Sequence, residues 1–374
     1  MIYFDHAAST PIVEASLNIY TESLVEDFAN PSAAHKLGKS SMKKVERART
    51  QVLKLLKAKK SDQLIFLSSA TEANNLAIKG VPLEKGSRVH FSLGDHPSTV
   101  EPVKSLLAEQ VEIPLQVGGG INEEAFLKTL NENSKLIVLS HVNNQSGNLY
   151  NILSLAKRAK EIIPGIHIHV DGVQALTKVE VNLSAHIDTY TISGHKIGAP
   201  KGIGALFIRN DVDLRTQLHG GGHEFGVRSS TVNTPLILSF AEAIRIGFES
   251  RESAFSHIEE VNSLMRKELT KRELGIEFPF SFEETSPYIL SFLLPSISSD
   301  IVLRHLEMKE IFVASSSACS SKAKGYNAGF DAMKIHESQH KFVLRTSFSK
   351  DSTVLEVQEF VEEFSKIIRE IKSL

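Results

Sequence analysis

The fold is decided by the stretch Ile166-His167-Ile168-His169-Val170-Asp171, a short β-branched run that ends in a carboxylate. Runs of this kind alternate with helical patterns from about residue 60 to residue 210, which is typical of a parallel sheet built from βα units. The strands that we predict are Leu64–Leu67, Arg88–Ser92, Leu136–Ser140, Ile166–Val170, Ile187–Ile192 and Gly204–Ile208. This part of the chain therefore predicts a large α/β domain.

Polar residues follow most of the predicted strands. They are Ser68–Glu72, Asp95-His96, Asn143-Asn144, Asp171 with Gln174, and Ser193–Lys196. In open parallel sheets, ligands bind beyond the carboxyl ends of the strands. We therefore expect these side chains to line one site.

The residue types at this edge match the needs of a pyridine cofactor that carries a phosphate. Such a cofactor requires an amine for an imine bond, an acid at the ring nitrogen and a phosphate cradle. Lys196 offers the amine, Asp171 offers the acid, and the helix that opens at Ser68–Glu72 would attract phosphate with its backbone N–H groups. Taken singly, a Ser-Thr cluster before a helix is usually an N-cap, and an aspartate after a strand is usually a turn residue. Their joint position along one sheet edge favours the cofactor site.

Composition limits the possible classes of protein. Lys and Arg total 42 against 44 Asp and Glu in 374 residues, so no overall charge favours nucleic acid or a membrane surface. No apolar run approaches the roughly 18–20 residues of a membrane span, and we expect a cytoplasmic protein with no membrane partner.

The chain has a single cysteine, Cys319. One cysteine excludes an intrachain disulfide and a thiolate-cluster metal site, and we expect no metal. A buried spectator, a surface thiol and a nucleophile remain open. The small polar residues on both sides of Cys319 argue against a core position and indicate a loop.

Motifs along nearly the whole chain resemble, in order, those of NifS/IscS-type cysteine desulfurases, which are class V aminotransferase relatives of pyridoxal-phosphate fold type I. The matching stretches are Tyr3–Pro11, Asn30–Ser32, Ala70–Ala77, His141–Gly147, Val170–Ala175, Ser193–Gly202, Gly220–Glu224 with Arg228–Thr231, Ser317–Ser321 and Arg345–Phe348. The resemblance implies a large α/β domain, residues 12–250, with a mainly parallel seven-stranded sheet flanked by helices. A smaller α+β domain, residues 1–11 and 251–374, would carry the cysteine loop and a substrate-binding arginine.

The resemblance also assigns roles around the cofactor ring. Lys196 would hold pyridoxal 5′-phosphate, Asp171 would pair with the ring nitrogen, and Gln174 would bond the phenolic oxygen. His96 would stack on the ring and move protons. Cys319 would receive the substrate sulfur as a persulfide.

Further roles concern the phosphate and the substrate. The phosphate ligands would be Ala70, Thr71, Ser193 and His195, joined by Thr231 from the second subunit of a homodimer. Arg345, helped by Asn144, would bind the substrate carboxylate, a task that suits the guanidinium fork. Asn144 would also contact the cofactor.

The function implied is the conversion of L-cysteine to L-alanine, with sulfur passed to an acceptor protein such as an iron–sulfur scaffold, or to tRNA thiolation. A selenocysteine lyase or another enzyme of this fold is the nearest alternative, and a non-catalytic scaffold is another. Nucleic-acid binding at Lys36–Lys60 is disfavoured because its apolar residues form one helical stripe, so its charges form an ordinary solvated face. A dehydrogenase is disfavoured because Gly202-Ile203-Gly204 lacks the third glycine of a dinucleotide site.

Three positions depart from the family pattern. His6 stands where asparagine is usual, and Phe225 stands where arginine is common, on a surface that could meet an acceptor. Lys322–Gly329 replaces the usual Gly-Ser and Glu-Pro-Ser pattern after Cys319.

Overall fold

The computed structural model describes residues 1–183, 185–315 and 326–373, and a seven-stranded sheet forms its centre. In spatial order the strands are β2 (Gln63–Leu67), β8 (Gly204–Ile208), β7 (Thr189–Ser193), β6 (His167–Asp171), β5 (Ser134–Ser140), β3 (Arg88–Phe91) and β4 (Glu109–Glu112). Strand β8 runs antiparallel to both of its neighbours, and the other neighbouring pairs are parallel. The mainly parallel seven-stranded sheet is thereby confirmed.

The six predicted strands occur within two residues of their expected ends. Strand β4 is not among them because three of its four residues are exposed at the sheet edge, which leaves no apolar run to detect. Strands β7 and β8 are buried at every position, as expected for strands covered on both faces.

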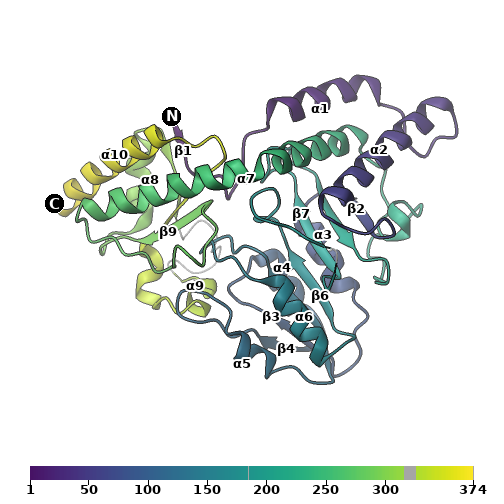
Figure 1. Cartoon of the computed structure of the whole chain (residues 1–374), viewed down its shortest axis with the longest axis horizontal. Coiled ribbons are helices and arrows are strands. Elements are labelled where there is room, and N and C mark those ends of the chain that lie inside the picture. Colours follow the sequence, from purple (N-terminus) through teal and green to yellow (C-terminus); the bar gives the residue numbers. More distant parts are fainter. Residues whose placement is uncertain (184, 316–325, 374) are drawn as a thin grey trace.

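Helices cover both faces of the sheet, shown in Figure 1. The first helices along the chain are α1 (Glu14–Glu26), α2 (Lys36–Leu55), α3 (Ala70–Gly80), α4 (Pro97–Lys104), α5 (Glu123–Leu127) and α6 (Ile152–Ile162). Leu64 and Phe66 of β2 pack with α2 and α6 in the main core on one face of the sheet, whereas Ile65 and Leu67 pack with α3 and α4 on the other face. Alternate residues of one strand thus feed the two faces.

Helix α2 carries the basic stretch considered above as a nucleic-acid site. Val45, Ala48 and Val52 are buried on its inner face. The predicted amphipathic helix is therefore confirmed.

A second hydrophobic core lies around a smaller set of strands at the N- and C-terminal ends of the chain. In one small sheet β1 (Ile2–Tyr3) pairs with β10 (Ile311–Phe312). In the other, β12 (Val343–Ser347) lies between β11 (Ala314–Ser315) and β9 (Ile289–Leu293). The remaining elements are α8 (Ser299–Glu307), α9 (Ala328–Ala332), α10 (Val354–Ser373) and the short 3₁₀ helices η1 (Glu224–Gly226) and η3 (Glu337–Phe342). The chain passes from one small sheet to the other at Val313, between β10 and β11.

One long helix, α7 (Thr234–Lys271), joins the two hydrophobic cores (Figure 1). Its Ile237–Ile244 side chains pack in the first core, and Ile258, Val261 and Met265 pack in the second. The predicted domain boundary at residues 250–251 falls inside this helix, and the division into 12–250 and 1–11 with 251–374 stays a prediction. Among the described residues, no helix combines the length and apolar character needed to cross a membrane.

Candidate active site

The carboxyl ends of the parallel strands meet the N-termini of α3 and α4 around one cavity of about 230 Å³. Ten residues predicted for the site line it, and they are Ala70, Thr71, His96, Asn144, Asp171, Gln174, Ser193, His195, Lys196 and Arg345. Arg345 comes from β12, in the smaller set of strands, so the cavity joins the two parts of the chain. The structure therefore brings together residues that are 275 positions apart, from 70 to 345.

Two predicted site residues do not line this cavity. Thr231 lines a separate cavity, together with Ser68 and Arg228. Cys319 lies outside the described residues. The stretch that contains Cys319 begins after β11, whose Ala314 pairs with Arg345.

The amino end of α3 forms one wall. The Ser69 hydroxyl accepts a hydrogen bond from the Glu72 N–H at 3.2 Å, and the Ser68 hydroxyl donates to the Glu72 carboxylate at 2.6 Å. A Cβ on Gly204 would lie 2.8 Å from the Ser69 carbonyl carbon, so only glycine lets β8 come this close to the start of α3. The N–H groups at this helix end can receive an anion.

His195 lies at the end of β7, beside Ser193. Its Nδ1 atom is buried and has no hydrogen-bond partner among the described residues. Burial, followed by the charge of Lys196, lowers the pKa of His195 to about 4. The neutral ring can therefore act as a hydrogen-bond donor or acceptor toward a ligand.

Asp171 and Lys196 face this cavity from adjacent strand ends. The Asp171 carboxylate accepts from the Asn74 amide at 2.8 Å and from the Val173 N–H at 3.0 Å. Lys196 Nζ donates to the carbonyl oxygens of Ala7 and Ala8 at 2.6 and 2.7 Å. The N-terminal segment thus holds the lysine amine at the cavity wall.

His96 is the N-cap of α4, where Pro97 occupies the first turn. Its Nδ1 accepts from the Ser98 N–H at 3.1 Å and lies 2.8 Å from the Ser98 hydroxyl. Burial is the largest cause that lowers the pKa of His96. The lowered pKa favours the uncharged ring.

Arg345 is almost fully buried. One terminal nitrogen donates to the Asn144 carbonyl oxygen at 2.7 Å, and the other donates to Asp5 at 3.0 Å. Its Nε has no partner within the described part of the chain. Asn144 therefore holds the arginine through its backbone carbonyl and also lines the cavity, and its predicted role beside the arginine on the substrate stays a prediction.

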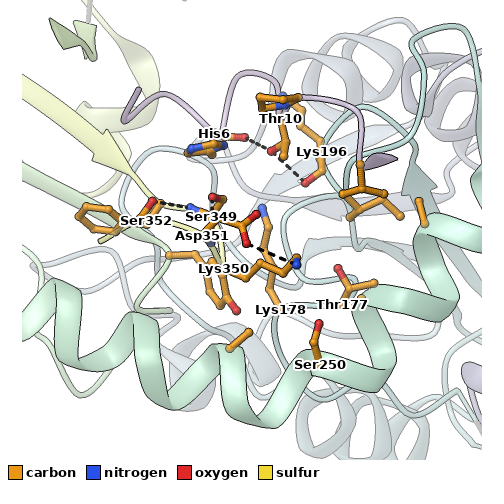
Figure 2. Close-up of a pocket in the computed structure, with 18 of the residues that line it drawn as sticks. His6, Thr10, Thr177, Lys178, Lys196, Ser250, Ser349, Lys350, Asp351 and Ser352 are labelled. Carbon is orange, nitrogen blue, oxygen red and sulfur yellow. Dashed lines mark hydrogen bonds and ion pairs between the residues drawn. The ribbon is translucent and has the colours of Figure 1, made fainter. Parts of the chain in front are cut away.

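A second cavity, of about 330 Å³, is lined by other residues of the N-terminal segment, and Lys196 lines both cavities. Figure 2 shows Thr10 between His6 and Lys196, where its hydroxyl lies 3.3 Å from the His6 carbonyl and 3.5 Å from that of Lys196. Lys178 is buried here and donates to the Gln174 side-chain oxygen at 3.3 Å. Burial, followed by the charges of Lys196 and Arg345, lowers the pKa of Lys178 to about 7.

The sequence alone did not assign roles to Asn74, Ser98, His169 and Lys178. Asn74 is fully buried on the same face of α3 as apolar residues, and His169 is fully buried within β6. A polar residue on the apolar face of a predicted helix, and a histidine inside an apolar strand, were the available signals.

The structure shows the environments of His6 and Phe225, two of the positions that depart from the family pattern. Burial, followed by the charge of Lys178, lowers the pKa of His6 to about 4. Phe225 is half exposed, and the Arg49 guanidinium lies 4.9 Å from its ring centre.

Known proteins share this sequence and architecture. Residues 2–360 match the family described as aminotransferase class-V. A protein named cysteine desulfurase IscS from Dictyoglomus turgidum is 31% identical over 86% of this chain and 83% of its own length. A solved structure titled NifS-like protein superposes with a TM-score of 0.91 at 27% identity, covering 98% of this chain and 99% of the other. Another, titled SspA in complex with cysteine, has a TM-score of 0.81 at 27% identity over 94% and 100% of the two chains.

Proposed function

Because the chain belongs to the class-V aminotransferase family, whose members depend on pyridoxal 5′-phosphate, we propose that it is a cysteine desulfurase. The reaction converts L-cysteine to L-alanine and leaves the sulfur on Cys319 as a persulfide. The observation that carries the proposal is the single cavity on which Lys196, Asp171, His96 and Arg345 converge. The relative named cysteine desulfurase and the neighbour solved with cysteine support the choice of substrate.

The residues of the cavity fit pyridoxal 5′-phosphate. The start of α3 offers N–H groups for the phosphate, joined by Thr71, Ser193 and His195, whose buried Nδ1 has no partner in the part of the chain that the structure describes. Asp171 offers a carboxylate for the ring nitrogen, and Gln174 an amide for the phenolic oxygen. When bound, the cofactor accepts the electrons released at the substrate α-carbon.

This chain's own residues perform the remaining tasks. Lys196 holds the cofactor and takes the α-proton of the substrate, since its amine lies at the cavity wall. Arg345 binds the substrate carboxylate, because a guanidinium held by Asn144 and Asp5 still has N–H donors to offer.

Cys319 accepts the sulfur as a thiolate. The carbon–sulfur bond of the substrate breaks, and a sulfur–sulfur bond forms at Cys319. Cysteine plus the enzyme thiol thus gives alanine plus the enzyme persulfide, and no outside oxidant or reductant is needed. An acceptor, such as an iron–sulfur scaffold protein or a tRNA thiolation protein, then removes the sulfur.

The working assembly in this proposal is a homodimer. Thr231 lines a separate cavity of its own chain, and we assign it to the phosphate held by a second copy. The exposed apolar side chains Leu24, Val25 and Phe28, on or just after α1, offer a surface for that copy. A dimer mixed from Lys196→Ala and Thr231→Ala chains should recover about half the wild-type activity per dimer, because one of its two sites is then intact. If the mixed dimer were as inactive as each single-variant dimer, the two subunits would not share residues between their active sites.

The defining experiment supplies the purified protein with cofactor and L-cysteine, with and without a thiol reductant, and measures alanine and sulfide. Alanine should form in both conditions, and sulfide should appear mainly with reductant. Cys319→Ser should retain the cofactor absorbance and lose alanine production by orders of magnitude, because a serine hydroxyl is far less nucleophilic than a thiolate. Turnover of selenocysteine alone would instead establish a selenocysteine lyase. The cytoplasmic location stays a prediction.

A further inference from the structure

A chain of buried polar side chains connects Asp171 to His96 through Asn74. The Asn74 amide nitrogen lies 2.8 Å from the Asp171 carboxylate and 2.8 Å from the Ser98 hydroxyl. The Ser98 hydroxyl in turn lies 2.8 Å from His96 Nδ1. Asn74 is fully buried and joins two groups that line the active-site cavity, one at the end of β6 and one at the start of α4.

The donors in this chain have a defined direction. Both N–H bonds of Asn74 are used, one on Asp171 and one on Ser98. The reverse orientation of the amide would set its oxygen against the Asp171 carboxylate, with no proton between them. The carboxylate therefore determines which way the amide points.

The protonation of His169 is determined by its contact with the Asn74 side-chain oxygen. The Asn74 oxygen can only accept, and it lies 3.1 Å from His169 Nε2, which must therefore carry a proton. His169 Nδ1 then accepts from the Thr189 hydroxyl at 2.9 Å. Both ends of the His169 ring are thus satisfied in the neutral form, and burial lowers the pKa of His169 to about 3. His169 holds Asn74 without adding a charge.

At the opposite end, the network determines the tautomer of His96. The Ser98 oxygen accepts from Asn74, so its own proton goes to His96 Nδ1. The Ser98 backbone N–H also points at His96 Nδ1, at 3.1 Å, and a backbone N–H cannot reverse its role. His96 Nδ1 is therefore an acceptor with two donors, and the ring proton must lie on Nε2.

We propose that Asn74 is a positioning residue that orients the Asp171 carboxylate and, through Ser98, holds His96 as a neutral ring with its proton on Nε2. His96 then offers a hydrogen-bond donor to the cavity and does not act as the base. Lys196 alone then removes the α-proton of the substrate. His96 keeps the implied role of stacking on the ring but takes no proton from the substrate. This inference rests on the proposed function for the meaning of Asp171 and His96, but its geometry concerns only described side chains.

The test compares Asn74→Asp with Asn75→Asp in the cofactor-loaded enzyme. The two residues are neighbours on α3, but the Asn75 side chain is half-buried, and within residues 1–183, 185–315 and 326–373 it bonds only the Thr71 carbonyl of its own helix, at 2.9 Å. Asn74→Asp keeps the shape and replaces a donor with a carboxylate oxygen. It repels Asp171 and draws the Ser98 proton away from His96.

Three measurements report on Asp171 and His96, the two ends of the hydrogen-bond network. Asn74→Asp should shift the pH titration of the cofactor's visible absorption band, and it should speed cofactor release by about 10- to 100-fold, the range for a lost hydrogen bond to a charged group. In protein labelled with ¹⁵N-histidine, the His96 signals, identified by their loss in His96→Gln, should show a protonated Nε2 and a bare Nδ1 in the wild type. The Nδ1 signal should shift in Asn74→Asp, because the Ser98 hydroxyl then donates to the new carboxylate, and it should stay unchanged in Asn75→Asp; the Ser98 backbone N–H keeps Nδ1 an acceptor in both variants.

A second variant separates the two arms and remains available if Asn74→Asp does not fold. Ser98→Ala removes the hydroxyl proton donated to His96 but keeps Asn74 on Asp171. It should change the His96 signals and leave the rate of cofactor release within about twofold of wild type. A protonated Nδ1 in the wild type, or identical titrations for the two aspartate variants, would overturn the proposal. These readouts need no turnover, so an enzyme that makes no alanine would refute the proposed function and leave this inference standing.

Discussion

The ion pair between Arg49 and Glu224, next to the loop that carries Thr231, allows a prediction about thermal stability. Both side chains are buried, and two N–H groups of Arg49 meet the two carboxylate oxygens of Glu224 at 2.9 Å. The Phe66 N–H also donates to Glu224, at 2.7 Å. This contact holds η1 on β2 although Glu224 and Phe225 have φ angles of 48° and 57°, in the left-handed region that side chains disfavour.

The perturbation is Glu224→Gln, which preserves shape and removes the negative charge. Burial lowers the pKa of Arg49, and its hydrogen bonds to the Glu224 carboxylate raise that pKa overall. The substitution removes this carboxylate, but a guanidinium stays protonated at neutral pH without a partner, so the charge of Arg49 is left buried and uncompensated. Breaking a buried pair from one side costs about 3–5 kcal/mol. At ~2.1 cal/mol/K of unfolding entropy per residue, a chain of 374 residues should then lose about 4–6 °C in Tm.

The matched control is Glu46→Gln, which removes a second carboxylate from the same arginine. Glu46 lies 3.2 Å from Arg49 Nε, but its side chain is 49% exposed. An exposed pair contributes ~0–1 kcal/mol, so the control should lose about 1 °C or less. Calorimetry of the cofactor-loaded enzymes measures both. Equal Tm values for the two variants would refute the reasoning, since Glu224 is buried and also accepts from the Phe66 N–H, whereas Glu46 is half exposed.

Three further predictions concern the cavity and its supports. Arg345→Lys should lower kcat/KM for cysteine by roughly 30-fold or more, corresponding to ~2 kcal/mol or more, with an unchanged cofactor spectrum; steady-state kinetics measure it, and unchanged kinetics would place the carboxylate elsewhere. The Lys178 pKa is lowered from 10.5 to about 7, so between these values the unfolded chain binds more protons than the folded one. The stability of the wild type relative to Lys178→Met should therefore rise with pH from about 7 to about 10 in thermal unfolding, and a pH-independent difference would show that Lys178 titrates normally. A Cβ on Gly172 would lie 1.9 Å from the buried Tyr190 ring, so Gly172→Ala should lower Tm, and adding Tyr190→Leu should restore part of the loss; no recovery would locate the strain elsewhere.

The site residues at strand ends were predictable because their placement follows from local pattern and one general rule. Asp171, Ser193 and Lys196 each come at or just after a buried run, and parallel strands present their carboxyl ends at one edge of a sheet. Their meeting in one cavity required only that the runs be parallel neighbours. The edge strand β4 was not predictable by the same reasoning, because a mostly exposed strand needs no apolar pattern.

The chain by itself determined the type of fold, the order of its strands along the sequence and the residues that could perform the chemistry. Tertiary structure alone decided that Asn74 joins Asp171 to Ser98, since residues distant in sequence carry no mark of which donor meets which acceptor. It also decided that Arg345 is held by Asp5 and Asn144, and that Thr231 lies outside its own chain's cavity. The physical reason is range: hydrophobic periodicity is written in neighbouring residues, whereas hydrogen-bond partners and burial depend on contacts that exist only after the chain has folded.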